Sequence, residues 1–355
     1  MTHFETLGWD ETWAAAFAPF VEQGLEPARV AVAHRGAVVV QAAGGETTAS
    51  PSGRMLHEGV DAVVGDWVAL LRPPQGDARI EAVLPRRTAL VRTSAGTGGR
   101  AQVLAANVDL VMVVAGLDGD FNPRRVERAL VAVAESGAAA MVVLNKADAC
   151  AGLAERVRAM QDAAPGVPVH AVSALTGEGL APIEAACTAG RTVVLLGSSG
   201  VGKSTLLNRL LGQAAQATAA VRAHDSRGRH TTTQRTLFLL PGGGVLIDTP
   251  GLRELRLWGD TTAAEQAFGD LETLAAGCRF GNCQHQGEPG CAVRRAIADQ
   301  TLGEDRLTSF RKLERELAFA ERREDPRARA AEAKRWRQIH KDVGRHMDQK
   351  YGRER

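Results

Sequence analysis

The sequence lacks an uninterrupted apolar run of 18 residues, so it predicts no membrane-spanning helix. Its first 20 residues hold three acidic side chains and no basic stretch ahead of an apolar block, which argues against a secretory signal peptide. Only five cysteines occur, and this odd number argues against a framework of disulfide bonds. We therefore expect a cytoplasmic protein with reduced thiols.

Lysine is also scarce, since only six of the 43 basic residues are lysines. The rest of the composition, 45% hydrophobic and 24% charged, is that of a globular protein, and the length suffices for about two to three domains. The net charge of +2 is uneven, because residues 326–355 carry ten basic and four acidic side chains. This helical, cationic end favours a polyanionic partner, with a solvated helix as the alternative.

Two hydrophobic patterns follow one another along the chain. Residues 28–92 hold short Val-rich segments separated by turn residues, which indicates a small β-barrel with the OB-fold as one candidate. After a Gly-rich linker at 93–100, apolar strands alternate with helical stretches, which is typical of a doubly wound α/β domain. The predicted organisation is an N-terminal extension at 1–27, a barrel at 28–95, an α/β domain at 96–258 and a helical domain at 259–355.

Residues 197–204 have the sequence GSSGVGKS, directly after an apolar strand and before a helix, which is the context of a phosphate-binding loop. Its backbone N–H groups and the helix N-terminus would face the phosphates. Lys203 would reach the β- and γ-phosphates, and Ser204 would bind Mg²⁺. The nucleotide-binding residues expected in this segment are Gly197, Ser198, Ser199, Gly200, Val201, Gly202, Lys203, Ser204 and Thr205.

The motif DTPG follows another apolar strand. Asp248 at the strand end can hold Mg²⁺, usually through water, and the Gly251 N–H can sense the γ-phosphate. Between the two motifs lies the polar segment SRGRHTTTQR, in which one threonine could complete the Mg²⁺ shell only when the γ-phosphate is present. Thr231, Thr232 and Thr233 remain alternatives, with Thr232 taken as the candidate; a β-rich loop edge is the other interpretation.

The motif NKAD at 145–148 ends a further apolar strand and points to guanine. Asp148 can accept hydrogen bonds from N1–H and the 2-amino group of guanine, whereas adenine would leave this carboxylate unpaired, which disfavours an ATPase. Asn145 would tie the base-binding segments together, and the Lys146 stem would lie over the nucleotide. Ser173 and Ala174 would offer a backbone N–H to the guanine carbonyl.

The order of these motifs is the informative point. In ordinary small GTPases the phosphate loop precedes the base-reading motif, but here NKAD precedes GSSGVGKS and DTPG. The sequence therefore predicts a circularly permuted GTPase domain. The chain leaves this domain soon after DTPG, so the nucleotide state could reposition the C-terminal domain.

A cysteine-rich segment, CRFGNCQHQGEPGC, follows the GTPase motifs. Three thiolates and one imidazole at close spacing form a closed tetrahedral zinc site, which we interpret as structural. The alternative is three unpaired buried cysteines with a surface histidine. The expected zinc ligands are Cys278, Cys283, His285 and Cys291, while Cys150 and Cys187 stand alone and are expected to be buried.

Together these features resemble the RsgA (YjeQ-like) family of bacterial ribosome-biogenesis GTPases. The resemblance rests on VGDWV, LPRR, AANVDLV, NKAD, GSSGVGKST, GRHTTT, IDTPGLRE and the cysteine cluster with its EPGCAV ending. Asn282 departs from the expected aspartate but is not a ligand. The resemblance implies GTP hydrolysis on the small (30S) ribosomal subunit during its late maturation, and contact of the OB-fold and zinc domain with ribosomal RNA. For the barrel this contact rests on analogy more than on charge, since residues 29–92 carry a net charge of only +2.

The residue after DTPG is Leu252, where many GTPases carry a glutamine that orients water. We therefore expect slow intrinsic hydrolysis that the subunit stimulates. His230 is the candidate for positioning water, unless it only stabilises its loop, and the catalytic candidates are His230, Lys203 and Thr232. The expected partners are GTP or GDP with Mg²⁺, the small subunit and its rRNA, but no membrane and no second copy of the chain. A nucleotide-gated rRNA-binding protein whose hydrolysis is incidental is the alternative function.

Overall fold

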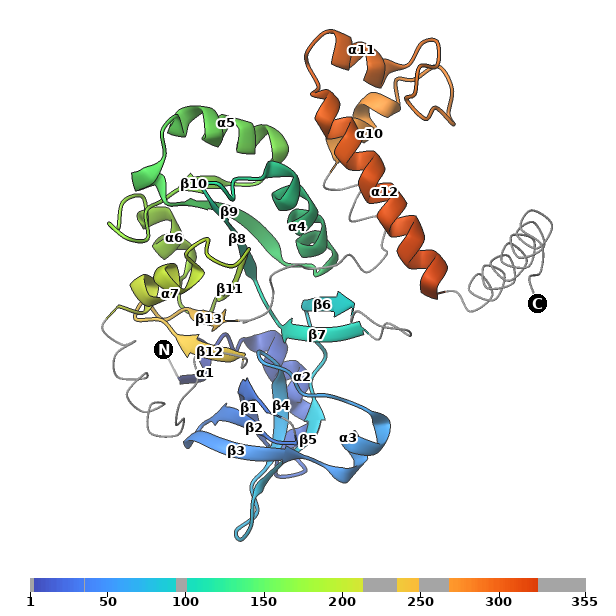
Figure 1. Ribbon diagram of the computed structural model, residues 1–355. Helices are drawn as coiled ribbons and strands as arrows, with labels where there is room; N and C mark the ends of the chain where they lie inside the picture. The colour runs from blue at the N-terminus through green and yellow to red at the C-terminus, as the bar shows by residue number, and fades with distance from the viewer. Residues whose placement is uncertain (1–2, 35, 94–100, 213–234, 249–267, 325–355) are drawn as a thin grey trace, which may run out of the picture. The chain divides into compact units, whose positions relative to one another are not determined.

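The computed structural model describes residues 3–34, 36–93, 101–212, 235–248 and 268–324 (Figure 1). The chain divides into two compact units, Met1–Arg256 and Leu257–Arg355, which are described one at a time. Within the described residues, no helix is long and apolar enough to cross a membrane.

Five strands of the first unit close into a barrel, as the short Val-rich segments predicted (Figure 1). Their order is β1-β2-β3-β5-β4, and β4 pairs again with β1. The β3–β5 pair is parallel and the other pairs are antiparallel. Apolar side chains such as Val40 and Ile80 fill the interior. The elements are β1 Glu26–Ala33, β2 Val38–Ala42, β3 Gly45–Pro51, α3 Gly53–Glu58, β4 Trp67–Leu71 and β5 Ala78–Val83.

The α/β part of the first unit is a sheet in the order β10-β9-β8-β11-β13-β12, parallel except for β12. Both faces of β8 are buried: Val111 and Val113 belong to one apolar core and Met112 and Val114 to another. Burial on both faces explains the uninterrupted apolar runs of these strands. The strands are β8 Leu110–Gly116, β9 Ala139–Asn145, β10 Val169–Ala171, β11 Thr192–Leu196, β12 Thr236–Leu239 and β13 Val245–Asp248.

Four helices cover this sheet, two on each face. Helices α4 and α5 contribute Val126 and Met160 to the first core, whereas α6 and α7 contribute Ile183 and Leu206 to the second. The predicted doubly wound α/β domain is therefore confirmed. The helices are α4 Pro123–Glu135, α5 Leu153–Ala163, α6 Ala181–Ala186 and α7 Lys203–Leu211.

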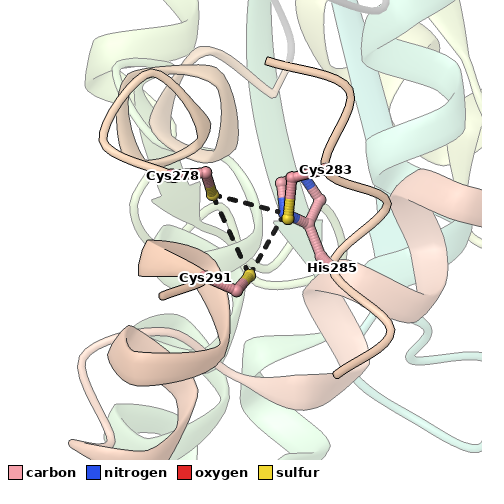
Figure 2. A group of neighbouring side chains, drawn as sticks. All are labelled: Cys278, Cys283, His285 and Cys291. Atoms are coloured by element: carbon pink, nitrogen blue, oxygen red, sulfur yellow. Dashed lines mark hydrogen bonds between the residues drawn. The ribbon is translucent and has the colours of Figure 1, made fainter. Parts of the chain in front are cut away.

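The second unit contains three described helices, α10 Gly269–Ala275, α11 Ala292–Ala298 and α12 Glu304–Glu324. Arg306 of α12 forms an ion pair with Asp270 of α10 at 2.5 Å, and the rings of Phe268 and Phe310 lie 5.4 Å apart. The cysteine-rich segment connects α10 to α11, and its four candidate ligands point toward one another (Figure 2). The cationic stretch at 326–355 lies outside the described residues.

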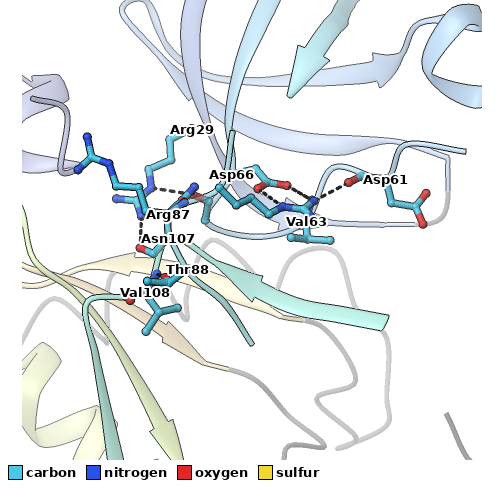
Figure 3. Close-up of polar contacts among 10 residues, drawn as sticks. Arg29, Asp61, Val63, Asp66, Arg87, Thr88, Asn107 and Val108 are labelled. Atoms are coloured by element: carbon cyan, nitrogen blue, oxygen red, sulfur yellow. Dashed lines mark hydrogen bonds and ion pairs between the residues drawn. The ribbon is translucent and has the colours of Figure 1, made fainter. Parts of the chain in front are cut away.

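Barrel and α/β sheet form one continuous sheet of 11 strands, because Val32 of β1 pairs with Thr236 of β12. Arg29 is buried at this junction (Figure 3). Its Nη2 donates to the Thr192 hydroxyl at 2.8 Å and to the Asn107 carbonyl at 3.3 Å. Its Nε donates to the Gly65 carbonyl at 3.3 Å, and its Nη1 donates to the Leu7 carbonyl. One guanidinium thus joins the barrel to the first residue of β11.

The motifs VGDWV, LPRR and AANVDLV meet at the same junction (Figure 3). The buried Asp66 carboxylate accepts two hydrogen bonds of 2.8 Å from Arg86, and its bond from Arg86 raises the pKa of that guanidinium. The Asn107 side chain accepts from the Arg87 N–H at 2.9 Å and donates to the Gly65 carbonyl at 3.1 Å. These motifs therefore attach the barrel to the α/β sheet.

The N-terminal extension also packs at the junction, through helices α1 His3–Thr6 and α2 Glu11–Val21. The Trp9 ring lies 4.7 Å from that of Trp67, and Trp13 and Phe17 are buried. Beyond the barrel, β6 Ala89–Thr93 and β7 Ala101–Ala106 form an antiparallel pair. The Gly-rich stretch expected to be a linker between domains thus connects two paired strands, and residues 94–100 themselves lie outside the described residues.

Candidate nucleotide site and metal centre

The phosphate loop runs from the end of β11 to the start of α7, as its sequence context predicted. Gly197 passes so close to β8 that a Cβ there would lie 2.2 Å from the Val114 carbonyl oxygen. The Lys203 ammonium donates to the carbonyl oxygens of Gly197 and Ser198 at 2.7 and 2.6 Å. The lysine therefore already points back over the loop that would hold the phosphates.

Asn145 connects three segments that lie far apart in the sequence. It ends β9 and is buried, with 3% of its surface exposed. Its Nδ2 donates to the Val201 carbonyl of the phosphate loop at 2.9 Å, and its Oδ1 accepts from the Ala174 N–H at 2.9 Å. Gly202 has φ +95, and a Cβ there would lie 2.2 Å from Asn145 Nδ2, so only glycine fits. The permuted motifs thus meet in space.

The motif residues after Asn145 differ in exposure, since Lys146 is half-buried and Asp148 is exposed. Lys146 has a left-handed backbone (φ 68) and forms an ion pair with Asp118 at 2.5 Å. The hydrogen bond from Lys146 holds the pKa of the Asp118 carboxyl below its ordinary value. Asp148 is exposed in the short 3-10 turn Ala147–Ala149. Sequence reasoning missed Asp118, although its place two residues after the end of β8 is at the strand-end edge where such sites form.

The backbone N–H groups expected to meet guanine already have partners in the protein. Ser173 N–H donates to the Glu178 carbonyl at 2.9 Å, and Ala174 N–H donates to Asn145. A guanine carbonyl would therefore share the Ala174 N–H with Asn145, or use another N–H of this loop.

The other expected site residues divide into described and undescribed ones. Ser199, Gly200, Ser204 and Thr205 are exposed, and Asp248 is half-buried at the end of β13. Ser198 Oγ accepts from the Arg125 guanidinium at 2.6 Å. The following expected residues lie outside the described part of the chain: His230, Thr231, Thr232, Thr233, Gly251 and Leu252.

The four expected metal ligands form one cluster in which all ligand atoms lie within 4.8 Å of one another (Figure 2). The Cys278 and Cys291 sulfurs are 3.9 Å apart, and His285 Nδ1 lies 3.6 and 3.4 Å from them. A tetrahedral ion with bonds of about 2.3 Å to sulfur and about 2.0 Å to nitrogen needs ligand separations of about 3.5–3.8 Å. The cluster therefore fits a closed tetrahedral metal site.

Backbone donors favour thiolates in this cluster. The Ala292 N–H donates to Cys278 Sγ at 3.3 Å, and the Arg294 N–H donates to Cys291 Sγ at 3.4 Å. Burial raises the pKa of the Cys278 thiol, but N–H groups at the start of α11 and the thiols of Cys283 and Cys291 together lower it more, so the pKa lies below its ordinary value. Burial raises the pKa of the Cys283 thiol to about 11. Soft thiolate ligands are those that zinc prefers.

The loop that carries His285 is braced by other side chains. His285 has φ 58, and its carbonyl accepts from Arg294 Nε at 2.7 Å and from Arg311 Nη2 at 2.6 Å. The Glu288 carboxylate accepts from the N–H groups of Gln284 and Gln286 at 2.9 and 2.6 Å. The loop geometry is thus fixed by contacts that the ligand spacing does not reveal.

The two remaining cysteines differ from each other. Cys187 is buried in the core between α6 and the sheet, as expected, and burial raises the pKa of its thiol to about 11. Cys150 is only half-buried, so the expectation of burial was wrong for this residue. It follows the turn at Asp148 and Ala149, which are both exposed, and its side chain packs at the border of the first core.

Comparison with known proteins decides the family. The sequence model of the RsgA GTPase family matches residues 83–258. The small ribosomal subunit biogenesis GTPase RsgA of Opitutus terrae is 48% identical over 352 residues, which cover 94% of this chain and 95% of that protein. The chain belongs to the RsgA GTPase family. The protein of the same name from Streptomyces coelicolor is also 48% identical, over 92% of this chain and 89% of its own length.

Solved structures agree with membership of the RsgA family. YjeQ from Thermotoga maritima superimposes with a TM-score of 0.63 at 25% identity, covering 83% of this chain and 99% of that one. YloQ, described as a circularly permuted GTPase, gives a TM-score of 0.58 at 21% identity over 85% of this chain and 96% of its own. The predicted circularly permuted GTPase fold is therefore confirmed, and the chain is a GTPase.

Proposed function

We propose that this chain is a GTPase of small ribosomal subunit biogenesis, the function that its curated relatives carry in their names. The observation that carries the proposal is similarity over almost the whole length, with 48% identity across 94% of the chain. The meeting of three nucleotide-binding segments at Asn145 supports the same conclusion. The proposed partners are GTP or GDP and the small subunit, in the cytoplasm.

The phosphate side of the proposed site uses Lys203, Ser204 and Asp248. Lys203 would exchange its two carbonyl acceptors for phosphate oxygens when nucleotide binds. Ser204 and Asp248 offer the hard oxygen ligands that suit Mg²⁺, which neutralises phosphate charge when bound. Gly251, His230 and one threonine of 231–233 are proposed for this side from the sequence alone.

The base side uses Asp148, whose carboxylate would accept from both guanine donors. Its exposure leaves it accessible to a base, and the left-handed turn at Lys146 directs the chain into this position. A carboxylate facing two donors favours guanine over adenine, so GTP is the proposed substrate.

The remaining modules would serve the ribosome. The strand order β1-β2-β3-β5-β4 and the helix between β3 and β4 support an OB-fold. The Cys278, Cys283, His285 and Cys291 cluster is proposed to hold one structural zinc ion, which would contribute folding energy to the second unit. Both modules are proposed to contact rRNA, within the domain division 1–27, 28–95, 96–258 and 259–355.

The test is GTP turnover of the purified, metal-loaded protein with and without small ribosomal subunits. We expect slow turnover alone, because Leu252 cannot hydrogen-bond water, and an increase of about tenfold or more with subunits. His230→Ala should lower only the stimulated rate, and Asp148→Asn should weaken binding of GTP but not of ATP. Absence of stimulation with intact GTP-dependent rRNA binding would instead support a nucleotide-gated binding protein.

A further inference from the structure

Arg209 joins the helix after the phosphate loop to the loop expected to read guanine. It lies on α7, six residues after Lys203. Its Nε donates to the Ala174 carbonyl at 3.3 Å, and its Nη2 donates to the Leu175 carbonyl at 2.5 Å. None of the sequence motifs includes this side chain.

Gly177 lies against the guanidinium of Arg209. Its φ is +94, and a Cβ there would lie 3.5 Å from Arg209 Cζ, so the guanidinium covers the backbone of this residue. The turn is fixed by its own bonds: Gly177 N–H donates to the Ser173 carbonyl at 2.8 Å, and Thr176 N–H donates to Ser173 Oγ at 3.1 Å. Arg209 therefore packs against a turn of defined shape.

Ala174 is held on both of its peptide groups. Its N–H donates to Asn145 Oδ1, and its carbonyl accepts from Arg209. Asn145 in turn donates to the Val201 carbonyl, two residues before α7 begins. The contacts form a closed ring through β9, the phosphate loop, α7 and the loop at 173–178. The peptide at 174–175 cannot rotate without breaking one of these bonds.

We propose that Arg209 is a positioning residue for recognition of the guanine 6-carbonyl group, an inference that rests on the proposed function. The Ala174 carbonyl and the Leu175 N–H belong to one planar peptide unit, so holding the carbonyl fixes the direction of that N–H. The same holds for the Leu175 carbonyl and the Thr176 N–H. A guanidinium presents its donors in a rigid plane, and it therefore fixes two carbonyls together.

The test compares three diphosphates on the full chain, by displacement of a fluorescent guanine nucleotide. GDP and IDP both carry the 6-carbonyl, IDP lacks only the 2-amino group, and ADP carries an amino group at position 6. For Arg209→Ala we expect dissociation constants about tenfold higher for GDP and for IDP, with ADP unchanged. Arg209→Lys, which keeps the charge but not the planar fork, should give an intermediate value.

Arg158→Ala is the matched control, because Arg158 is also an exposed arginine on a helix of the same domain. It should leave all three constants unchanged. Equal weakening of GDP, IDP and ADP by Arg209→Ala would overturn the inference, since α7 and the phosphate loop would then be disturbed as a whole. Unchanged GDP and IDP binding would overturn it too. A wild-type chain that does not prefer GDP over ADP would instead refute the proposed function.

Discussion

Arg29→Ala should destabilise the first unit strongly. The Arg29 side chain is fully buried and has four acceptors, one on the N-terminal segment, one on the barrel and two on the α/β part. Burial lowers the pKa of Arg29 to about 10, so the group stays charged at neutral pH. This lowering of the pKa corresponds to a cost of about 3 kcal/mol for keeping the charge, at 1.36 kcal/mol per pKa unit.

Alanine would remove that cost but leave the four acceptors without their donor, at about 1–3 kcal/mol each. It would also leave a cavity where the arginine stem packs. We therefore expect the free energy of unfolding of the first unit to fall by about 3–5 kcal/mol. Arg29→Lys should give a smaller loss, because an ammonium reaches fewer of the acceptors.

Urea unfolding followed by tryptophan fluorescence measures this loss, because the Trp67 ring lies 5.4 Å from Arg29 Cζ. With a slope of about 2–3 kcal/mol per M, the midpoint should fall by about 1–2.5 M. Arg79→Ala is the control, since Arg79 is exposed on β5 and its ion pair with Glu81 contributes at most about 1 kcal/mol. If Arg29→Ala costs no more than Arg79→Ala, the guanidinium does not hold the junction together.

Three further outcomes test other parts of the structure. Gly202→Ala should displace Asn145 and thereby raise the dissociation constant of GDP about tenfold or more. Gly166 also has a positive φ (+77), but a Cβ there would meet no neighbouring atom, so Gly166→Ala should leave this constant unchanged. Titration calorimetry measures both constants. Chelation should lower the helical circular dichroism of zinc-loaded protein, and Cys278→Ser should abolish this response. Burial raises the pKa of Asp270, but the hydrogen bond and charge of Arg306 together with nearby backbone N–H groups lower it more, so the pKa lies below its ordinary value. Asp270→Asn should therefore reduce stability near neutral pH, and in urea titrations the difference from wild type should disappear as the pH falls through the lowered pKa of Asp270.

The α/β part could be predicted because its strands are buried on both faces. β8 and β11 are continuous apolar runs, and the motifs at the carboxyl ends of β9 and β11 fix the direction of the chain. Strand starts were less accurate: β8 begins at Leu110, after Asn107 has adopted φ 56, whereas the apolar run begins at Val108. The hydrophobic pattern of the sequence does not predict this left-handed backbone conformation.

Contacts between distant segments could not be predicted. Arg29 resembles any other basic residue of a barrel strand, and only the fold shows it buried against Thr192. The same holds for the ion pair of Lys146 with Asp118 and for the hydrogen bond from Arg209 to Ala174, because no spacing in the sequence indicates that these residues meet. The group of metal ligands could be predicted, because the ligands of a closed metal site lie close together in this sequence. The hydrogen bonds from Arg294 and Arg311 to the His285 carbonyl could not, because they depend on how α11 and α12 pack around the loop.

The pairing of β1 with β12 affects how this protein can be shortened. β12 is the border strand of the α/β sheet, and the barrel covers its open side. A fragment without the first 83 residues would expose unpaired N–H and C=O groups along that border, which are a template for other chains. Such fragments should self-associate on concentration, so nucleotide-binding studies should retain the barrel.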